Sequence, residues 1–260
     1  MAQPTVVSAY YPIPSKFSIE KYLEWMIHFW PKTTFPLVFF TDPQIVPQFE
    51  LMFKDRGGPT RVIGLAFGEL AAFQKLSPKV WMDTRKLDPE QQKHSAELYA
   101  LWYEKKEFVL RTIQLNPFGS DRFVWCDAGI ARYPDWFQYL NYFPRREMIP
   151  ADKMLVLRIA PFEGAVDKHG IPGNFKEEVT VGGGILAADV SGWISWSKAY
   201  DAMLMKYYLA DRFIGKDQNI MASVILKNPQ LAVMVDPSEK LNVIQRWFYL
   251  LFFLGGVRVD

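Results

Sequence analysis

The sequence predicts an α/β protein, with a mostly parallel central sheet flanked by helices in a single domain. Short apolar runs alternate with longer segments in which apolar residues recur at helical spacing. Such alternation of strands and helices is typical of layered folds built on a parallel sheet. Half of the 260 residues are hydrophobic and 22% are charged, so the composition is that of a folded protein with a sizeable core.

The apolar runs give the strands and the segments between them give the helices. The predicted strands are residues 5–10, 37–40, 61–65, 123–126, 154–159 and 231–235. The predicted helices are residues 18–31, 42–58, 88–116, 191 to about 211, and a segment after residue 217. Ser18, Asp42 and Asp88 are predicted helix N-caps, and a proline follows each of the two aspartates.

Several side chains at predicted strand ends fall on one edge of this sheet. In open α/β sheets, ligands bind beyond the carboxyl ends of the strands. Tyr10 and Tyr11 end the first strand, Thr41 and Asp42 follow the second, and Asp127 follows the strand at residues 123–126. We therefore expect these residues to share one rim and to mark the ligand site.

Charge, cysteine content and missing motifs exclude several classes of function. The net charge is only +2, which argues against a nucleic-acid partner. The single cysteine cannot form an internal disulfide or a cysteine-based zinc site. The three histidines lie in separate segments, and no Walker A, G-x-G-x-x-G, H-E-x-x-H or G-x-S-x-G motif is present.

The expected location is the cytoplasm. The N-terminus lacks a basic region followed by a long apolar run, which argues against a signal peptide. The longest apolar run, residues 247–254, is far shorter than the ~20 residues that span a bilayer. This run either packs against the core or forms an adhesive surface for a partner. The sequence does not specify an oligomeric state.

The most informative local pattern is residues 116–132, in which a polar turn precedes an apolar strand that ends on Asp127. An aspartate there can ligate a hard divalent cation, which can in turn neutralise a diphosphate. Ala128 and Gly129 leave space for a ligand to approach the backbone. The alternative is an aspartate that only caps the following loop.

Beyond these patterns, the chain resembles the HtrL/YibB family. The resemblance is carried by TVVSAYYP, PLVFFTD, ELYALWYEKKEFV, NPFGSDRFVWCDAGIAR and VGGGILAADVSGW…KDQNIM, and it extends from about residue 5 to the segment at residues 247–249. Its most specific piece is the W-x-D-A-G block, formed by Trp125, Cys126, Asp127, Ala128 and Gly129.

The family is placed among glycosyltransferases of the GT-A fold, a Rossmann-like arrangement. The resemblance implies one domain with a nucleotide-sugar-binding half at residues 1–132 and an acceptor-binding half at residues 133–260. It also implies a nucleoside diphosphate sugar donor, expected to be a UDP-sugar. The partner would be a glycan or other hydroxyl acceptor, so the expected role is glycan biosynthesis.

The resemblance suggests a metal site but departs from the usual motif. Asp127 matches the first aspartate of the Asp-x-Asp element that helps many GT-A enzymes hold a metal on the donor diphosphate, whereas Gly129 occupies the second position. Either Asp127, water and the diphosphate hold Mn²⁺ or Mg²⁺, or basic residues neutralise the phosphates instead. The candidate basic residues are Lys105, Lys106, Arg111 and Arg132. Lys105 belongs to a W-x-x-K element associated with the family, and it could equally lie on a solvated helix face.

Other residues are assigned to the donor by the same resemblance. The end of the first strand, formed by Ser8, Ala9, Tyr10 and Tyr11, would hold the nucleoside, with a tyrosine stacked on the base. Asp42 would either accept a base or ribose hydrogen bond or serve only as a helix cap. Gly183 and Gly184, which follow Gly182, would lie beside the donor sugar and the acceptor, or form a plain bend.

Two carboxylates are candidate catalytic residues. Asp217, with Gln218, resembles an Asp-Gln pair found near the sugar in several GT-A families. It would act as base in an inverting transfer or orient the sugar in a retaining one, unless it only stabilises a helix N-terminus. Asp189 is the second candidate. Trp193 and Trp196 follow it and form either an acceptor platform or an ordinary core stripe.

Three functions remain open at this point. A glycosyltransferase is the leading hypothesis. A non-catalytic sugar or sugar-nucleotide binding protein on the same scaffold is the alternative, motivated by the incomplete Asp-x-Asp element. A nucleotidyltransferase is the third, although no clear triphosphate loop is present.

Overall fold

The computed structural model describes residues 2–134, 136, 140 and 142–256. Its centre is a seven-stranded sheet in the order β3-β2-β1-β4-β6-β5-β7. The strands are β1 (Thr5–Tyr10), β2 (Leu37–Thr41), β3 (Thr60–Gly64), β4 (Arg122–Cys126), β5 (Met154–Arg158), β6 (Val181–Asp189) and β7 (Ala232–Val235). Strands from both halves of the chain therefore share one sheet. Residues 1, 135, 137–139, 141 and 257–260 of the predicted domain lie outside the described residues.

The sheet is mixed because β6 runs against its neighbours. The strand pairs β1–β2, β2–β3, β1–β4 and β5–β7 are parallel, whereas β6 is antiparallel to both β4 and β5. The predicted α/β class with a mostly parallel sheet is confirmed. The carboxyl ends of β1, β2 and β4 meet on one edge, as expected for parallel strands.

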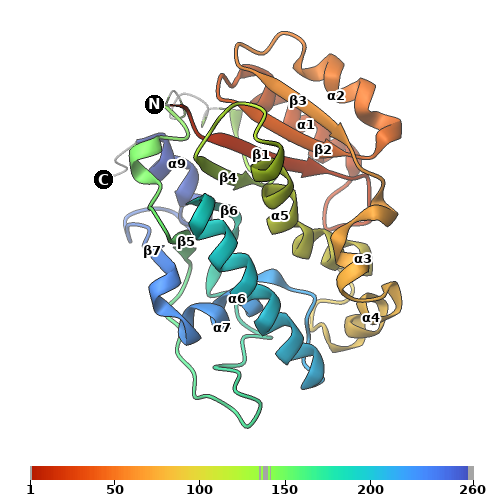
Figure 1. Ribbon diagram of the computed structural model, residues 1–260, viewed down its shortest axis with the longest axis vertical. Coiled ribbons are helices and arrows are strands. Elements are labelled where there is room, and N and C mark those ends of the chain that lie inside the picture. Colours follow the sequence, from red (N-terminus) through yellow and green to blue (C-terminus); the bar gives the residue numbers. More distant parts are fainter. Residues whose placement is uncertain (1, 135, 137–139, 141, 257–260) are drawn as a thin grey trace.

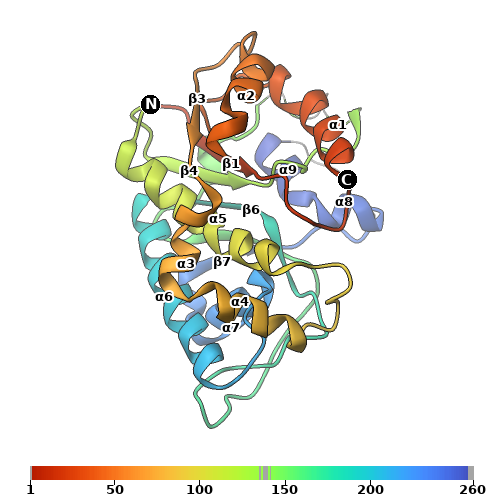
Figure 2. The ribbon, with the colours of Figure 1, turned by 90° about the vertical axis from the view of Figure 1, so that its right-hand side faces the viewer.

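Helices cover both faces of the sheet (Figures 1 and 2). They are α1 (Ile19–Phe29), α2 (Val46–Phe53), α3 (Ala71–Lys75), α4 (Pro78–Thr84), α5 (Ala96–Leu115), α6 (Val190–Leu209), α7 (Asp217–Lys227), α8 (Val243–Trp247) and α9 (Tyr249–Gly255). In Figure 2, α5 and α6 lie on one side of the sheet, and α1 and α9 lie on the other.

The core consists of two apolar layers, one on each face of the sheet. Along β1, Val7 and Ala9 pack with residues of α5, α6 and α7, whereas Val6 and Tyr10 pack with residues of α1, α2 and α9. This alternation follows the two-residue period of a strand. Because both faces are covered, β1 is buried along its whole length.

Most predicted helix boundaries follow the capping signals. The Ser18 side chain accepts a hydrogen bond from the Lys21 N–H at 3.3 Å, which caps α1. Asp42 caps the short 3-10 turn before α2 by accepting from the Gln44 N–H at 3.0 Å. At the C-terminal end of α5, Asn116 adopts a left-handed conformation with φ of 33°, which ends the helix.

The helix predicted from Asp88 begins later than expected. Asp88 is buried and accepts hydrogen bonds from the Glu90 N–H, from His94 and from the Tyr99 hydroxyl, so it organises a turn instead of a helix. The helix starts at Ala96, where the Ser95 hydroxyl caps the Leu98 N–H. The short helices α3 and α4 were not predicted.

The glycine segment before Asp189 is a strand, which the sequence did not predict. β6 pairs with β4 from Ile185 to Asp189 and with β5 at Val181 and Gly182. Gly182 is therefore part of the ladder, whereas the β5–β6 register shifts across the stretch that holds Gly183 and Gly184. Because β6 is antiparallel, its carboxyl end lies at the sheet edge opposite Asp127.

The apolar run at residues 247–254 packs against the body of the chain. Leu250, Leu251 and Leu254 are buried with the core layer that faces α1 and α2. Trp247 is the exception, with 40% of its surface exposed. No helix in the described part of the chain combines the length and apolar character needed to cross a membrane.

Candidate functional site

A cavity of about 600 Å³ opens at the carboxyl edge of β1 and β4. Its walls come from the end of β1, the loop after β4, the first half of β6, α5, the start of α7, and α8. These segments are far apart in the sequence and meet only because the strands share one sheet. The position agrees with the general location of ligands in open α/β sheets.

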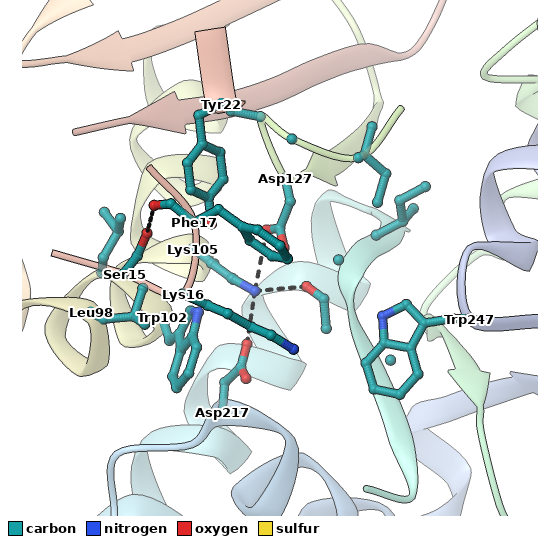
Figure 3. A pocket seen from close by; sticks show the side chains of 18 of the residues that line it. Ser15, Lys16, Phe17, Tyr22, Leu98, Trp102, Lys105, Asp127, Asp217 and Trp247 are labelled. Atoms are coloured by element: carbon teal, nitrogen blue, oxygen red, sulfur yellow. Dashed lines mark hydrogen bonds and ion pairs between the residues drawn. The ribbon is translucent and has the colours of Figure 1, made fainter. Parts of the chain in front are cut away.

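A buried lysine joins two carboxylates in the wall of this cavity (Figure 3). The Lys105 Nζ lies 3.2 Å from Asp127 Oδ1 and 3.0 Å from Asp217 Oδ2. It also donates a hydrogen bond to the Gly183 carbonyl at 2.9 Å. The side chains of Lys105 and Asp217 are only 8% and 7% exposed, whereas that of Asp127 is 39% exposed. Asp127 is therefore the member of this cluster most accessible from the cavity.

Neighbouring groups fix Asp127 in place. The Trp125 indole N–H donates to Asp127 Oδ1 at 2.7 Å, and the Asp127 N–H donates to the Gly184 carbonyl at 2.8 Å. The Trp125 ring is stacked on Phe108 of α5, with 5.9 Å between centroids and 10° between planes. The strand-end aspartate is thus oriented by its own strand, by β6 and indirectly by α5.

The glycines of β6 allow Asp217 to come this close. A Cβ atom on Gly183 would lie 2.8 Å from Asp217 Oδ2, which is too near without movement. A Cβ on Gly184 would lie 3.0 Å from Ile130 Cδ1. The glycine run lies within a strand and therefore serves close packing of that strand against site residues.

The electrostatics of the cluster keep Lys105 charged. Burial alone would lower the pKa of the Lys105 ammonium group, but attraction by Asp127 and Asp217 outweighs burial and raises it. Burial is also the main influence on Asp127, where together with the nearby Asp217 charge it raises the carboxyl pKa against the attraction of Lys105 and the Trp125 hydrogen bond. An ammonium group shared by two carboxylates leaves this cluster with excess negative charge when both are ionised.

The structure brings together most of the residues predicted for the donor. Those that line the cavity are Ala9, Tyr10, Tyr11, Lys105, Trp125, Asp127, Ala128, Gly129, Arg132, Gly183, Gly184, Asp217 and Gln218. The Tyr11 hydroxyl is already used, because it donates to the Leu65 carbonyl at 2.9 Å. The Gln218 amide donates to the Val181 carbonyl, which holds the start of α7 against β6.

Other candidates lie outside the cavity walls. Ser8 and Cys126 are fully buried within the sheet, and burial raises the pKa of the Cys126 thiol well above its usual range. Asp42 serves as a cap. Lys106 pairs with Asp201 at 2.9 Å on another side of α5, and Arg111 lies 4.0 Å from the buried Glu104.

Asp189 is placed away from the cavity, at the opposite edge of the sheet. It faces Arg122, the first residue of β4, and caps α6 by accepting from the Gly192 N–H at 2.8 Å. Trp193 and Trp196 are 0% and 1% exposed and belong to the core. The reversed direction of β6 explains why this segment does not reach the cavity.

Several cavity residues were missed by sequence reasoning. Lys16 and Phe17 precede α1, His94 precedes α5, and Trp247 and Phe248 come from the C-terminal apolar run. Figure 3 shows Lys16 reaching into the cavity and Trp247 on the far side from Lys105. No motif marks these positions, because they come from loops and from a segment that resembles core.

Asp127 is the carboxylate of this cluster that the cavity leaves most open to a divalent cation. Within the described residues, no group of three His, Cys, Asp or Glu side chains is arranged to hold a metal. Asp127 Oδ1 already faces an ammonium group and an indole N–H, and Gly129 supplies no side-chain ligand. A cation bound at Asp127 would therefore compete with the Lys105 Nζ for the same carboxylate.

Comparison with known proteins gives one family match and remote structural likenesses. No curated protein sequence matches this chain significantly. The crystal structure of mouse xyloside xylosyltransferase 1 in its apo form is similar at a TM-score of 0.49 and 11% identity, covering 94% of this chain and 93% of that chain. The glycosyltransferase GlyE of Streptococcus pneumoniae TIGR4 is similar at a TM-score of 0.39 and 11% identity, covering 90% of this chain and 45% of that chain. The family model described as "Bacterial protein of unknown function (HtrL_YibB)" matches residues 15–251, and the chain therefore belongs to the HtrL/YibB family.

Proposed function

We propose that this protein transfers a sugar from a nucleoside diphosphate donor, expected to be a UDP-sugar, to a hydroxyl of a glycan or other acceptor. The observation that carries the proposal is the Asp127–Lys105–Asp217 cluster in the wall of a cavity at the carboxyl ends of the strands. The sequence resemblance to GT-A glycosyltransferases gives Asp127 to the donor diphosphate and makes Asp217 a candidate catalytic residue near the sugar.

The proposed donor pose follows the cavity from β1 to α7. The nucleoside lies at the end of β1, near Ala9 and Tyr10, where the walls are largely apolar. The donor sugar lies near Asp217 and Gly183. Asp127 sits between these two regions, close to the diphosphate. The outer part of the cavity, beside Trp247, is then left for the acceptor.

The proposed reaction replaces one bond at the anomeric carbon. The bond from that carbon to the diphosphate oxygen breaks and its electron pair leaves with the diphosphate. A bond to the acceptor oxygen forms, and the acceptor proton passes to a base. In this scheme Asp217 is the catalytic residue, because its carboxylate lies in the cavity wall against Gly183, where the donor sugar is placed. Lys105 is a positioning residue that holds both aspartates.

A matched pair of aspartate variants tests the proposal. Each purified variant is mixed with UDP-, GDP-, CDP- and dTDP-sugars, and release of the nucleoside diphosphate is measured together with its binding. We expect Asp217→Asn to lower turnover ~100-fold or more, the usual scale for a lost acid–base group, while the diphosphate still binds. Asp189→Asn is the control, because this aspartate lies at the opposite edge of the sheet and should leave turnover unchanged.

The outcomes separate the competing functions. Wild-type protein that binds one nucleoside diphosphate but neither transfers nor hydrolyses any donor would be a binding protein on this scaffold, the hypothesis motivated by Gly129. Full turnover in Asp217→Asn would contradict the assigned role. Absence of binding to every nucleotide would reject the proposed donor class.

A further inference from the structure

The positive charges of the cavity divide into paired and unpaired groups. Its charged lining residues are Lys16, Glu90, Lys105, Asp127, Arg132, Lys216 and Asp217. Lys105 is shared by two carboxylates, and Lys216 lies 3.3 Å from Glu90. Among residues 2–134, 136, 140 and 142–256, no carboxylate forms an ion pair with Lys16 or Arg132. The charge available to an anion therefore comes from these two side chains.

Arg132 is held in place by aromatic rings and not by an acid. Its guanidinium carbon lies 4.6 Å from the Trp25 ring centroid, 4.9 Å from that of Phe17 and 5.0 Å from that of Phe248. These rings come from α1, from the loop before it and from the segment between α8 and α9. Three distant parts of the chain thus fix one guanidinium group at the cavity, five residues after Asp127.

The hydrogen-bonding capacity of Arg132 is unused within the described residues. Its Nε is buried without a hydrogen-bond partner, and no described residue accepts from its terminal nitrogens. The contacts with the rings use the charge of the guanidinium group and not its N–H groups, so these donors remain available to an anion. Arginine keeps its charge in proteins, even though burial lowers the pKa of Arg132.

A diphosphate group matches this arrangement. Guanidinium groups bind phosphate oxygens through two parallel charged hydrogen bonds, and those bonds are stronger when the donor is already oriented. The leaving diphosphate must be stabilised by positive charge, and Lys105 is already shared by two carboxylates. Among the described residues, no group of three His, Cys, Asp or Glu side chains is arranged to hold a cation there.

We propose that Arg132, clamped by Phe17, Trp25 and Phe248, is the group that binds and neutralises the donor diphosphate, so that the site works without a divalent cation. This assignment rests on the proposed function for the identity of the donor. The chemistry of the anion is independent of the proposed function, since any compact diphosphate would bind Arg132. Lys16, on the loop that carries Phe17, is placed to add a second charge.

The test compares three probes on one set of variants in buffer containing EDTA. Binding of UDP, inorganic pyrophosphate and uridine is measured by calorimetry to wild type, Arg132→Gln and Arg132→Lys. We expect Arg132→Gln to weaken UDP and pyrophosphate by about 10- to 100-fold, the scale of a lost charge-assisted contact, and to leave uridine unchanged. The affinity of Arg132→Lys for UDP and pyrophosphate should lie between those of wild type and Arg132→Gln, because lysine keeps the charge and loses the paired geometry.

A control variant and the uridine probe guard against a folding defect. Arg146→Gln removes the same charge at the opposite sheet edge, where Arg146 pairs with Asp121, and it should bind all three probes like wild type. Equal weakening of uridine and UDP by Arg132→Gln would make Arg132 a structural residue and overturn the proposal. Loss of UDP binding in EDTA, restored by Mn²⁺ or Mg²⁺, would also overturn it.

Failure of the donor hypothesis gives a different result. If wild type binds pyrophosphate in an Arg132-dependent manner but binds no nucleoside diphosphate, the anion site stands and the nucleotide donor is wrong. If wild type binds neither pyrophosphate nor any nucleotide, both proposals are rejected.

Discussion

At the scale of single residues, the most unusual group is Lys105, an ammonium 8% exposed at the base of a cavity. A buried charge is tolerated only when partners replace water, and here two carboxylates and the Gly183 carbonyl do so. Such a cluster contributes little net stability as a whole, but it makes each member dependent on the others. The structural role of this cluster is to hold Asp127 and Asp217 at the cavity wall.

Removing the lysine alone should therefore be costly. We expect Lys105→Met to lower the free energy of unfolding by about 3 kcal/mol at pH 7, because Asp217 stays buried without its partner. The double variant Lys105→Met/Asp217→Asn should recover part of that loss, and urea unfolding of all four members of the cycle measures the coupling. Additive losses would show that the pair does not interact. In wild type, the raised pKa means that the lysine's contribution persists at neutral pH and is lost only as pH rises beyond about 10.4.

Glu104, the neighbour of Lys105, predicts a second pH effect. It is fully buried and accepts hydrogen bonds from the Ala71 and Ala72 N–H groups at the start of α3. Burial raises the pKa of Glu104 to about 7, so the folded state holds this proton more tightly than the unfolded state. Stability from this group is full at low pH and falls between pH ~4.5 and ~7, by up to ~3 kcal/mol. Urea unfolding at several pH values should show a smaller decline across this range in Glu104→Gln than in wild type, and an equal decline would contradict the assignment.

At the scale of elements, β6 is the strand that builds the site. It separates the parallel strands β1 and β4 from β5 and β7, and its glycines let Lys105 and Asp217 approach from α5 and α7. Its reversed direction also sends Asp189 to the far edge. The course of β6 thus explains why Asp217 reaches the cavity and Asp189 does not.

A methyl group on this strand should disturb the site more than the fold. In Gly183→Ala the new Cβ would lie 2.8 Å from Asp217 Oδ2, so the carboxylate must move. We expect a stability loss of about 1–2 kcal/mol, typical of mild overpacking, together with reduced turnover. Gly68→Ala is the control, because its Cβ would meet no atom within 4 Å. Wild-type turnover in Gly183→Ala would show that the position of Asp217 is not critical.

At the scale of the whole molecule, aromatic residues divide between core and cavity. Trp193 is fully buried and its indole N–H donates to the Phe123 carbonyl at 2.9 Å, which ties α6 to β4. Trp247 lines the cavity and is 40% exposed. Similar residues in similar apolar segments therefore serve different purposes.

A pair of tryptophan variants should separate stability from ligand binding. We expect Trp193→Phe to lower the unfolding free energy by about 2 kcal/mol through lost packing and a lost hydrogen bond, without changing ligand affinity below the transition. Trp247→Ala should change stability by less than about 1 kcal/mol and weaken ligands that reach the outer cavity. Thermal unfolding combined with binding measurements checks both, and reversed effects would contradict this division.

The sequence by itself determined the α/β class, the positions of six strands, and the family. These conclusions came from local signals, namely the apolar period, the capping residues and the W-x-D-A-G block. Such signals can be recognised without knowledge of the tertiary structure. They also placed Asp127 at a strand end. The family resemblance, through the W-x-x-K element and the Asp-Gln pair, selected Lys105 and Asp217 as candidates.

Only the tertiary structure decided how these candidates combine. The residues of a strand do not determine its direction in the sheet. The antiparallel β6, and the position of Asp189 at the edge opposite the cavity, could therefore not be predicted from the local pattern. Lys105 contacts one aspartate more than twenty residues away and another more than one hundred residues away. Arg132 contacts three rings, each more than one hundred residues away. Long-range packing sets such contacts, because it alone fixes which loops share one edge of the sheet.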